Sequence, residues 1–118
     1  MLRDHPFFGA GLAGYPKIFS PYHKATYIEI YQYPHNIILN FWSELGLLGL
    51  IALLWLIIQF TRTALQQKQY RLLACMLVIV IHGLVDVPYF KNDLAVFFWL
   101  LIALTFHRGS RMVEKSKE

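Results

Sequence analysis

The chain has 118 residues, of which 57% are hydrophobic and only 15% are charged. This composition excludes an ordinary soluble domain, in which roughly a quarter of the residues are charged. The net charge of +4 does not indicate a nucleic-acid partner, because the basic residues lie mainly at the ends of apolar runs. The single cysteine, Cys75, excludes an internal disulfide. We therefore expect an all-α membrane protein.

The first 36 residues are rich in residues that break helices. Four prolines and three glycines lie among them, which excludes a long helix and predicts an ordered surface loop over residues 1–36. Within it, residues 24–33 are compatible with one short helix or strand. Five tyrosines give the loop an amphipathic aromatic surface. That surface favours anchoring at a membrane interface, and stacking against sugar rings is the alternative.

Three apolar runs follow the loop and predict three transmembrane helices. As a helix, the first run, 37–60, would be roughly 36 Å long at 1.5 Å per residue. This length exceeds the thickness of a hydrocarbon core, about 30 Å. The third run is short for a full crossing. The predicted order after the loop is a transmembrane helix at 37–60, a polar connector at 61–71, a second transmembrane helix at 72–87, a tight turn at 88–92, a third transmembrane helix at 93–107 and a polar tail at 108–118.

Lysine and arginine positions predict the orientation. The connector and tail carry seven of these residues, whereas the loop and turn carry four over a greater length. The first set is Arg62, Lys68, Arg71, Arg108, Arg111, Lys115 and Lys117, and the second is Arg3, Lys17, Lys24 and Lys91. Because positive charge is enriched in cytoplasmic segments, we expect the connector and tail in the cytoplasm and the loop on the opposite side of the membrane.

The sequence Pro34-His35-Asn36 predicts the start of the first long helix. Asn36 is a favourable N-cap, because its side-chain oxygen can accept from free N–H groups of the first turn. Pro34 keeps the preceding segment extended. His35 then lies beside the partial positive charge of a helix N-terminus, so we expect its imidazole to be neutral and able to accept a proton. A purely structural hydrogen-bonding role is the alternative from the residues alone.

Two motifs occur in a recognisable order. His35-Asn36 is followed by nine residues and then by Gly46-Leu-Leu-Gly49, and upstream lies His5-Pro-Phe-Phe-Gly9-Ala-Gly11. Together they resemble the O-antigen ligase and O-antigen polymerase family of bacterial inner membranes, over about residues 5–107. The resemblance implies that the loop is periplasmic. It also implies that the three helices belong to a larger multi-span, GT-C-like bundle whose N-terminal spans are missing here.

The resemblance also implies a reaction in lipopolysaccharide biosynthesis. His35 would act as general base on an acceptor hydroxyl, of a sugar or of a protein, which attacks a glycan carried on undecaprenyl pyrophosphate. We expect an inverting transfer without metal or other cofactor, because the loop shows no Asp-x-Asp pair and no ligand cluster. Family enzymes hold the pyrophosphate with arginines, which we expect upstream of this chain rather than at Arg3, so that the chain alone is expected to be inactive.

Further polar residues lie within the apolar runs and are candidates for substrate binding. Asn36, Asn40 and Glu44 recur at intervals of four residues and predict one polar stripe, which either forms a structural hydrogen-bond network or lines a substrate cavity. Gly46 and Gly49 lie one turn apart and would let a neighbouring backbone approach closely.

Two further candidates lie near the periplasmic side. His82 and Asp86 are also four residues apart, and we expect them to pair either as packing contacts or as part of a polar cavity. Lys91 either pairs with Asp93 in solvent or contacts a lipid phosphate.

A non-enzymatic interpretation competes with the glycosyltransferase. In it, the chain is a three-span membrane module that packs against a larger partner through its tyrosine-rich loop. Both interpretations require a lipid bilayer, and neither requires nucleic acid.

Overall fold

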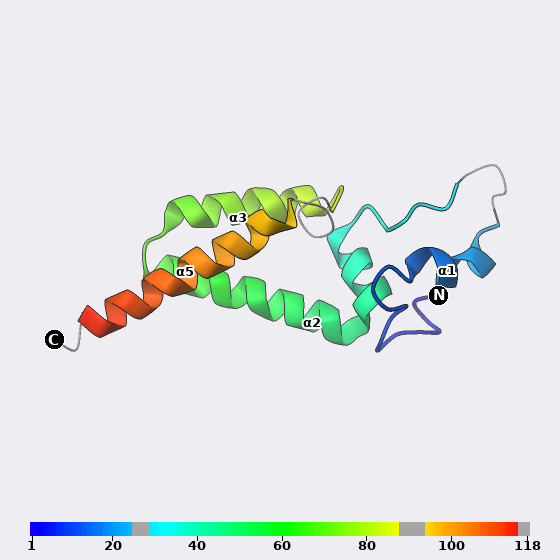
Figure 1. The fold of residues 1–118 in the computed structure, drawn as a ribbon, viewed down its shortest axis with the longest axis horizontal. Coiled ribbons are helices and arrows are strands. Elements are labelled where there is room, and N and C mark those ends of the chain that lie inside the picture. The colour runs from blue at the N-terminus through cyan, green and yellow to red at the C-terminus, as the bar shows by residue number, and fades with distance from the viewer. Residues whose placement is uncertain (25–28, 88–93, 116–118) are drawn as a thin grey trace.

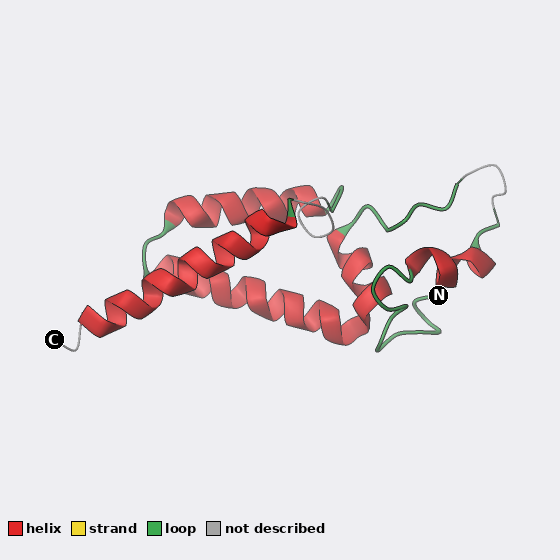
Figure 2. Ribbon diagram, in the orientation of Figure 1, coloured by secondary structure: helices red, strands yellow, loops and turns green. Residues whose placement is uncertain are grey.

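The computed structural model describes residues 1–24, 29–87 and 94–115, with 108–115 described as backbone only. These residues form helices and connecting loops, and none of them lies in a strand (Figure 2). The elements in chain order are α1 (Tyr15–Phe19), the 3-10 helix η1 (Ser20–Tyr22), α2 (Ile37–Gln66), α3 (Tyr70–Gly83) and α5 (Ala95–Lys115). The all-helical class predicted from the sequence is confirmed for this part of the chain.

The three long helices pack against one another in pairs. Figure 1 shows α3 returning along α2 and α5 running back again, while the N-terminal loop lies at the end where α2 begins. The molecule is elongated, with extents of 65 × 24 × 18 Å. The buried apolar core consists of Ile37, Leu53, Phe60, Ala64, Met76, Ile79, Val87 and Phe98.

Helix α2 begins at the predicted residue but is sharply bent. Asn36 is extended, with φ −156° and ψ 127°, and its side-chain oxygen accepts from the N–H groups of Ile38 and Leu39, as expected of an N-cap. At Gly46, φ is 70° and ψ is −170°, which breaks the helix into a first arm (37–45) and a second arm (47–66). Figure 1 shows the first arm turned away from the long second arm.

The N-terminal loop fills this break. A broken helix leaves main-chain donors and acceptors without partners, and leaving them unpaired in an apolar medium is costly. Here the loop motif supplies the partners through its own main chain. The three bonds run from the Ala10 N–H to the Ser43 carbonyl (2.7 Å), from the Gly11 N–H to the Glu44 carbonyl (2.9 Å) and from the Leu47 N–H to the Pro6 carbonyl (2.9 Å).

The indole of Trp42 reinforces this docking. Its Nε1 donates to the Pro6 carbonyl at 3.2 Å, the same oxygen that accepts from Leu47. One carbonyl of the loop therefore holds both arms of α2. The two sequence motifs, which are separated along the chain, meet at this point.

Glycine is required on both sides of the contact. A Cβ on Gly46 would lie 2.1 Å from the Phe7 carbonyl oxygen, and a Cβ on Gly9, where φ is +62°, would lie 2.6 Å from the Glu44 main chain. The close approach of a neighbouring backbone predicted at Gly46 is therefore confirmed, and the backbone is that of the loop. At Gly49, a Cβ would meet the side chain of Leu45 across the bend at 2.2 Å.

Helix α2 extends beyond the predicted span and into the predicted connector 61–71. It continues to Gln66, and only residues 67–69 separate it from α3. The helix ends in a Schellman arrangement, in which the N–H groups of Lys68 and Gln69 donate to the carbonyls of Leu65 and Ala64, and Lys68 has φ +55°. The polar residues after Phe60 are good helix formers, which explains the longer helix.

One described helix, α2, is long and apolar enough to cross a membrane. The predicted span 37–60 lies within this helix, but the bend at Gly46 divides it, and the second arm alone reaches about 30 Å. Helix α3 has 14 residues, about 21 Å, and ends at Gly83 before the predicted boundary at residue 87. The apolar part of α5, 95–107, is equally short, and the predicted turn 88–92 lies outside the described residues.

Most of the apolar surface of the helices is not covered by the chain itself. In the most apolar stretch of α2, only 28% of the residues are buried. Large apolar side chains on all three helices are exposed, among them Leu48, Trp55, Val78 and Trp99. A surface of this kind is stable only against lipid or other apolar helices, so the structure is that of a membrane-associated protein.

The glycine contact predicts a specific stability effect. We expect Gly46→Ala to lower the free energy of unfolding in detergent by at least about 2 kcal/mol, because it adds a clash to the strain of a left-handed residue. Gly11→Ala is the matched control, since Gly11 has φ +81° but nothing within 4 Å of the added Cβ. We expect it to cost about 1 kcal/mol. Two results together would contradict the docked arrangement. The two variants would lose the same free energy of unfolding in chemical denaturation, and the loop of Gly46→Ala would not be cleaved faster by a protease.

Candidate functional site

The candidate catalytic histidine lies where the start of α2 meets the end of α3. His35 Nδ1 is 2.9 Å from Asp86 Oδ1, and both side chains are partly exposed, at 46% and 42%. The Asp86 carboxylate is also held by the Val87 N–H, at 2.8 Å. A base and a carboxylate 51 residues apart in sequence therefore form one hydrogen-bonded pair.

The predicted pairing of His82 with Asp86 is joined by a second partner, His35. The His82 carbonyl accepts the Asp86 N–H at 2.9 Å, just after α3 ends at Gly83. The charge of His82 also contributes, less than the His35 hydrogen bond does, to lowering the pKa of Asp86.

The hydrogen bond determines which ring nitrogen of His35 can react. A carboxylate only accepts, so we assign the proton of the neutral ring to Nδ1, where it is donated to Asp86. Nε2 then carries the free electron pair. Within the described part of the chain, no hydrogen bond reaches Nε2, so this nitrogen is available to take a proton.

Two tyrosines complete the surroundings of the imidazole. Its ring centre lies 5.1 Å from that of Tyr31, edge-on at 87°, and 5.3 Å from that of Tyr33, tilted at 49°. Residues 31, 33 and 35 lie in a non-helical segment with bends at residues 32–33 and 35–36. Both tyrosines belong to the predicted aromatic surface of the loop, but their place at His35 follows only from the fold.

Asn36 fixes the position of His35 by binding two helices. While its Oδ1 caps α2, its Nδ2 donates to the Leu84 carbonyl at 2.9 Å, just after α3. The His-Asn pair therefore attaches to the end of α3 twice, once through each side chain.

The predicted polar stripe continues into the protein interior. Asn40 and Glu44 are only 4% and 3% exposed, and Ser43 beside them is equally buried. Asn40 Oδ1 has no hydrogen-bond partner among the described residues. The stripe thus passes from the His35 pair, through Asn36, to the docked loop, which binds the Glu44 carbonyl. Lys91, the remaining candidate, lies outside the described residues.

The pair also has an electrostatic consequence. The hydrogen bond from His35 is the largest influence that holds the pKa of Asp86 below its ordinary value of 3.8, followed by the Val87 N–H. Asp86 lies beyond the end of α3 and is partly exposed. Because its pKa is lowered on folding, the stability it contributes is present above pH 3.8 and is lost as the pH falls through the lowered value.

Among the described residues, no three His, Cys, Asp or Glu side chains lie close enough to share a metal ion. The site in this part of the chain is therefore built from one His–Asp pair, one capping amide and aromatic rings.

Comparison with known proteins gives an independent observation. Residues 1–54 match the O-antigen ligase family. This segment is therefore similar to O-antigen ligases. No curated protein and no solved structure matches the chain.

The O-antigen ligase match covers the loop, the first arm of α2 and the start of the second arm. It therefore includes both motifs that dock at Gly46, and it includes His35. Asp86 lies outside the matched residues, so its place beside His35 comes from the structure alone.

The His35–Asp86 contact predicts how Asp86 titrates. In an NMR titration of its carboxyl carbon, we expect a midpoint below 3.8, and we expect His35→Phe to move that midpoint up towards 3.8 because the main stabilising hydrogen bond is lost. His82→Phe is the control and should move it less. An Asp86 midpoint that does not respond to His35→Phe would contradict the pairing.

Proposed function

We propose that the chain is part of a membrane glycosyltransferase of the O-antigen ligase type. It would transfer a glycan from undecaprenyl pyrophosphate to an acceptor hydroxyl on the periplasmic face of the bacterial inner membrane, with His35 as general base. The observation that supports this most is the contact of His35 Nδ1 with Asp86 Oδ1 at 2.9 Å, which leaves Nε2 free, within a segment similar to O-antigen ligases.

The step follows from this geometry. The acceptor O–H gives its proton to Nε2 as its oxygen forms a bond to the anomeric carbon of the lipid-linked glycan. On the opposite face of that carbon, the bond to the pyrophosphate oxygen breaks, and its electron pair leaves with undecaprenyl pyrophosphate. The resulting imidazolium is stabilised by the Asp86 carboxylate, which does not itself need to take the proton.

The other residues take supporting roles in this proposal. Asp86 and Asn36 are positioning residues. Asp86 holds the tautomer of His35, and Asn36, the residue after His35, is anchored to the end of α3 by its own side chain. Asn40 and Glu44 would line the polar side of the substrate cavity, and the unpartnered Oδ1 of Asn40 supports this assignment. His82 and Lys91 remain candidates for binding the donor phosphates on the basis of the sequence.

The proposed topology places the loop in the periplasm. The second arm of α2 would cross the membrane towards residues 67–69 in the cytoplasm, with α3 and α5 as further, shorter spans of a larger bundle. The exposed apolar faces of all three helices support contact with additional spans. The same faces would suit a non-catalytic module bound to a larger partner, which is the alternative function.

Cysteine labelling tests this topology. In a Cys75→Ser background, we expect Gln32→Cys to react with a membrane-impermeant maleimide in intact spheroplasts, because the loop is periplasmic. Gln66→Cys, at the other end of α2, should react only after the membrane is permeabilised. If Gln66→Cys but not Gln32→Cys is labelled in intact spheroplasts, the loop is not periplasmic and the proposed placement of the site is wrong.

Substitution of the proposed base tests the chemistry. We expect His35→Ala to lower kcat for glycan transfer by on the order of 10²–10⁴ at unchanged membrane insertion. Asp86→Asn should also lower kcat, but by less, because the amide can donate to Nδ1 and favour the wrong tautomer. The control is His107→Ala, an exposed histidine on α5. If transfer by His35→Ala equals that of the control, the catalytic assignment fails and the module is favoured.

A further inference from the structure

An exposed aromatic ring lies beside the proposed base. Of the two tyrosines that contact His35, Tyr33 packs against the apolar core. Tyr31, in contrast, is 63% exposed. Its ring is edge-on to the imidazole, with the ring centres 5.1 Å apart, and much of its surface stays uncovered.

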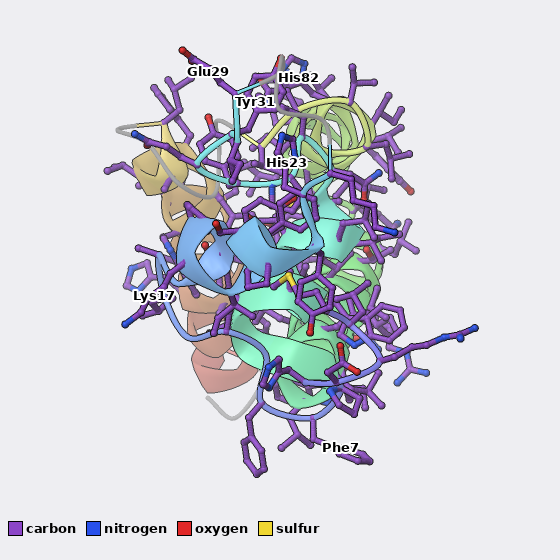
Figure 3. All side chains as sticks on the ribbon, turned by 90° about the vertical axis from the view of Figure 1, so that its right-hand side faces the viewer. Phe7, Lys17, His23, Glu29, Tyr31 and His82 are labelled. Carbon is purple, nitrogen blue, oxygen red and sulfur yellow. The ribbon has the colours of Figure 1, made fainter. Side chains whose placement is uncertain are left out.

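A carboxylate lies near this ring. Glu29 precedes Tyr31 by two residues in the same non-helical stretch. Figure 3 shows Glu29, Tyr31 and His82 at the same edge of the molecule. Glu29 is exposed, and a carboxylate accepts hydrogen bonds.

This combination matches the surface of a pyranose. One face of such a sugar presents C–H groups that stack on a flat aromatic ring, and its rim presents hydroxyls that donate to a carboxylate. A serine or threonine side chain of a protein has no apolar face of that size. A base at the edge of the same ring would meet a hydroxyl on the rim of the stacked sugar.

We propose that Tyr31 is the platform on which the acceptor sugar stacks, with Glu29 accepting its hydroxyls, so that this subsite selects a sugar hydroxyl rather than a protein hydroxyl as acceptor. The proposal rests on the function proposed above. It adds two residues and an acceptor class to that function.

Binding and transfer together test the subsite in the full-length membrane protein. With lipid A–core oligosaccharide as the probe, we expect Tyr31→Leu to raise the acceptor KM about tenfold while kcat changes little, and Tyr31→Phe to behave as wild type. Leucine keeps an apolar side chain at residue 31 but removes the flat ring. Glu29→Gln should raise KM less than Tyr31→Leu does.

Tyr70 provides a matched control. It is 62% exposed, almost the same as Tyr31, but lies at the start of α3, at the opposite end of the molecule. Tyr70→Leu should leave the acceptor KM unchanged. An equal effect of both leucine variants, or an effect of Tyr31→Leu on insertion alone, would show that Tyr31 is an interfacial anchor and would overturn the proposal.

A binding measurement separates this proposal from the catalytic one. In saturation-transfer NMR with the same oligosaccharide, His35→Ala should still bind, whereas Tyr31→Leu should bind about tenfold more weakly. If His35→Ala retains full transfer, the proposed function fails. If His35→Ala is inactive but Tyr31→Leu binds normally, or if a serine-containing peptide is the better acceptor, the subsite fails while the proposed function stands.

Discussion

The break in α2 at Gly46 is the constraint on which the rest of the structure depends. A helix broken in an apolar environment has unpaired main-chain groups, and the loop motif pairs three of them with its own main chain. The contact is so close that neither Gly9 nor Gly46 has room for a side chain. The bend gives α2 two functions, since the second arm has the length to cross the membrane while the first arm carries the candidate site at its start.

The position of His35 follows from two attachments of the first arm. At one end, the docked loop holds the arm through Ser43, Glu44 and Trp42. At the other end, Asn36 and His35 bind the residues just after α3. An imidazole that is fixed through the helix, through a carboxylate and through two aromatic rings has little freedom to reorient. Such preorganisation is what a general base requires if it is to meet one hydroxyl in one geometry.

The apolar exterior explains why this arrangement is incomplete in isolation. The short helices α3 and α5 do not reach across a hydrocarbon core by themselves, and most of their outward side chains are exposed. Further helices packed on those faces would bury them and enclose the space in front of His35. The surface around the His35 pair is polar and aromatic, which is consistent with the proposed site for a lipid-linked glycan and a polar acceptor.

The features that depend on local chemistry could be predicted from the amino-acid sequence. The all-helical class, the capped start of α2 at Asn36, the breaker-rich loop and the family resemblance all follow from residues that are neighbours in the chain. These predictions succeeded because capping, helix propensity and apolar periodicity act within a few residues. The end of α2 was predicted less accurately, because polar residues after Phe60 were interpreted as a connector although they also favour a helix.

How those segments meet depends on the fold. Local spacing predicted that Asp86 would pair with His82, and the fold adds a partner 51 residues away, His35. Close approach of a backbone at Gly46 was predictable, but the identity of that backbone was not, since it depends on what lies nearby in space. Contacts between distant segments arise from the path of the whole chain, and local residue preferences do not encode that path.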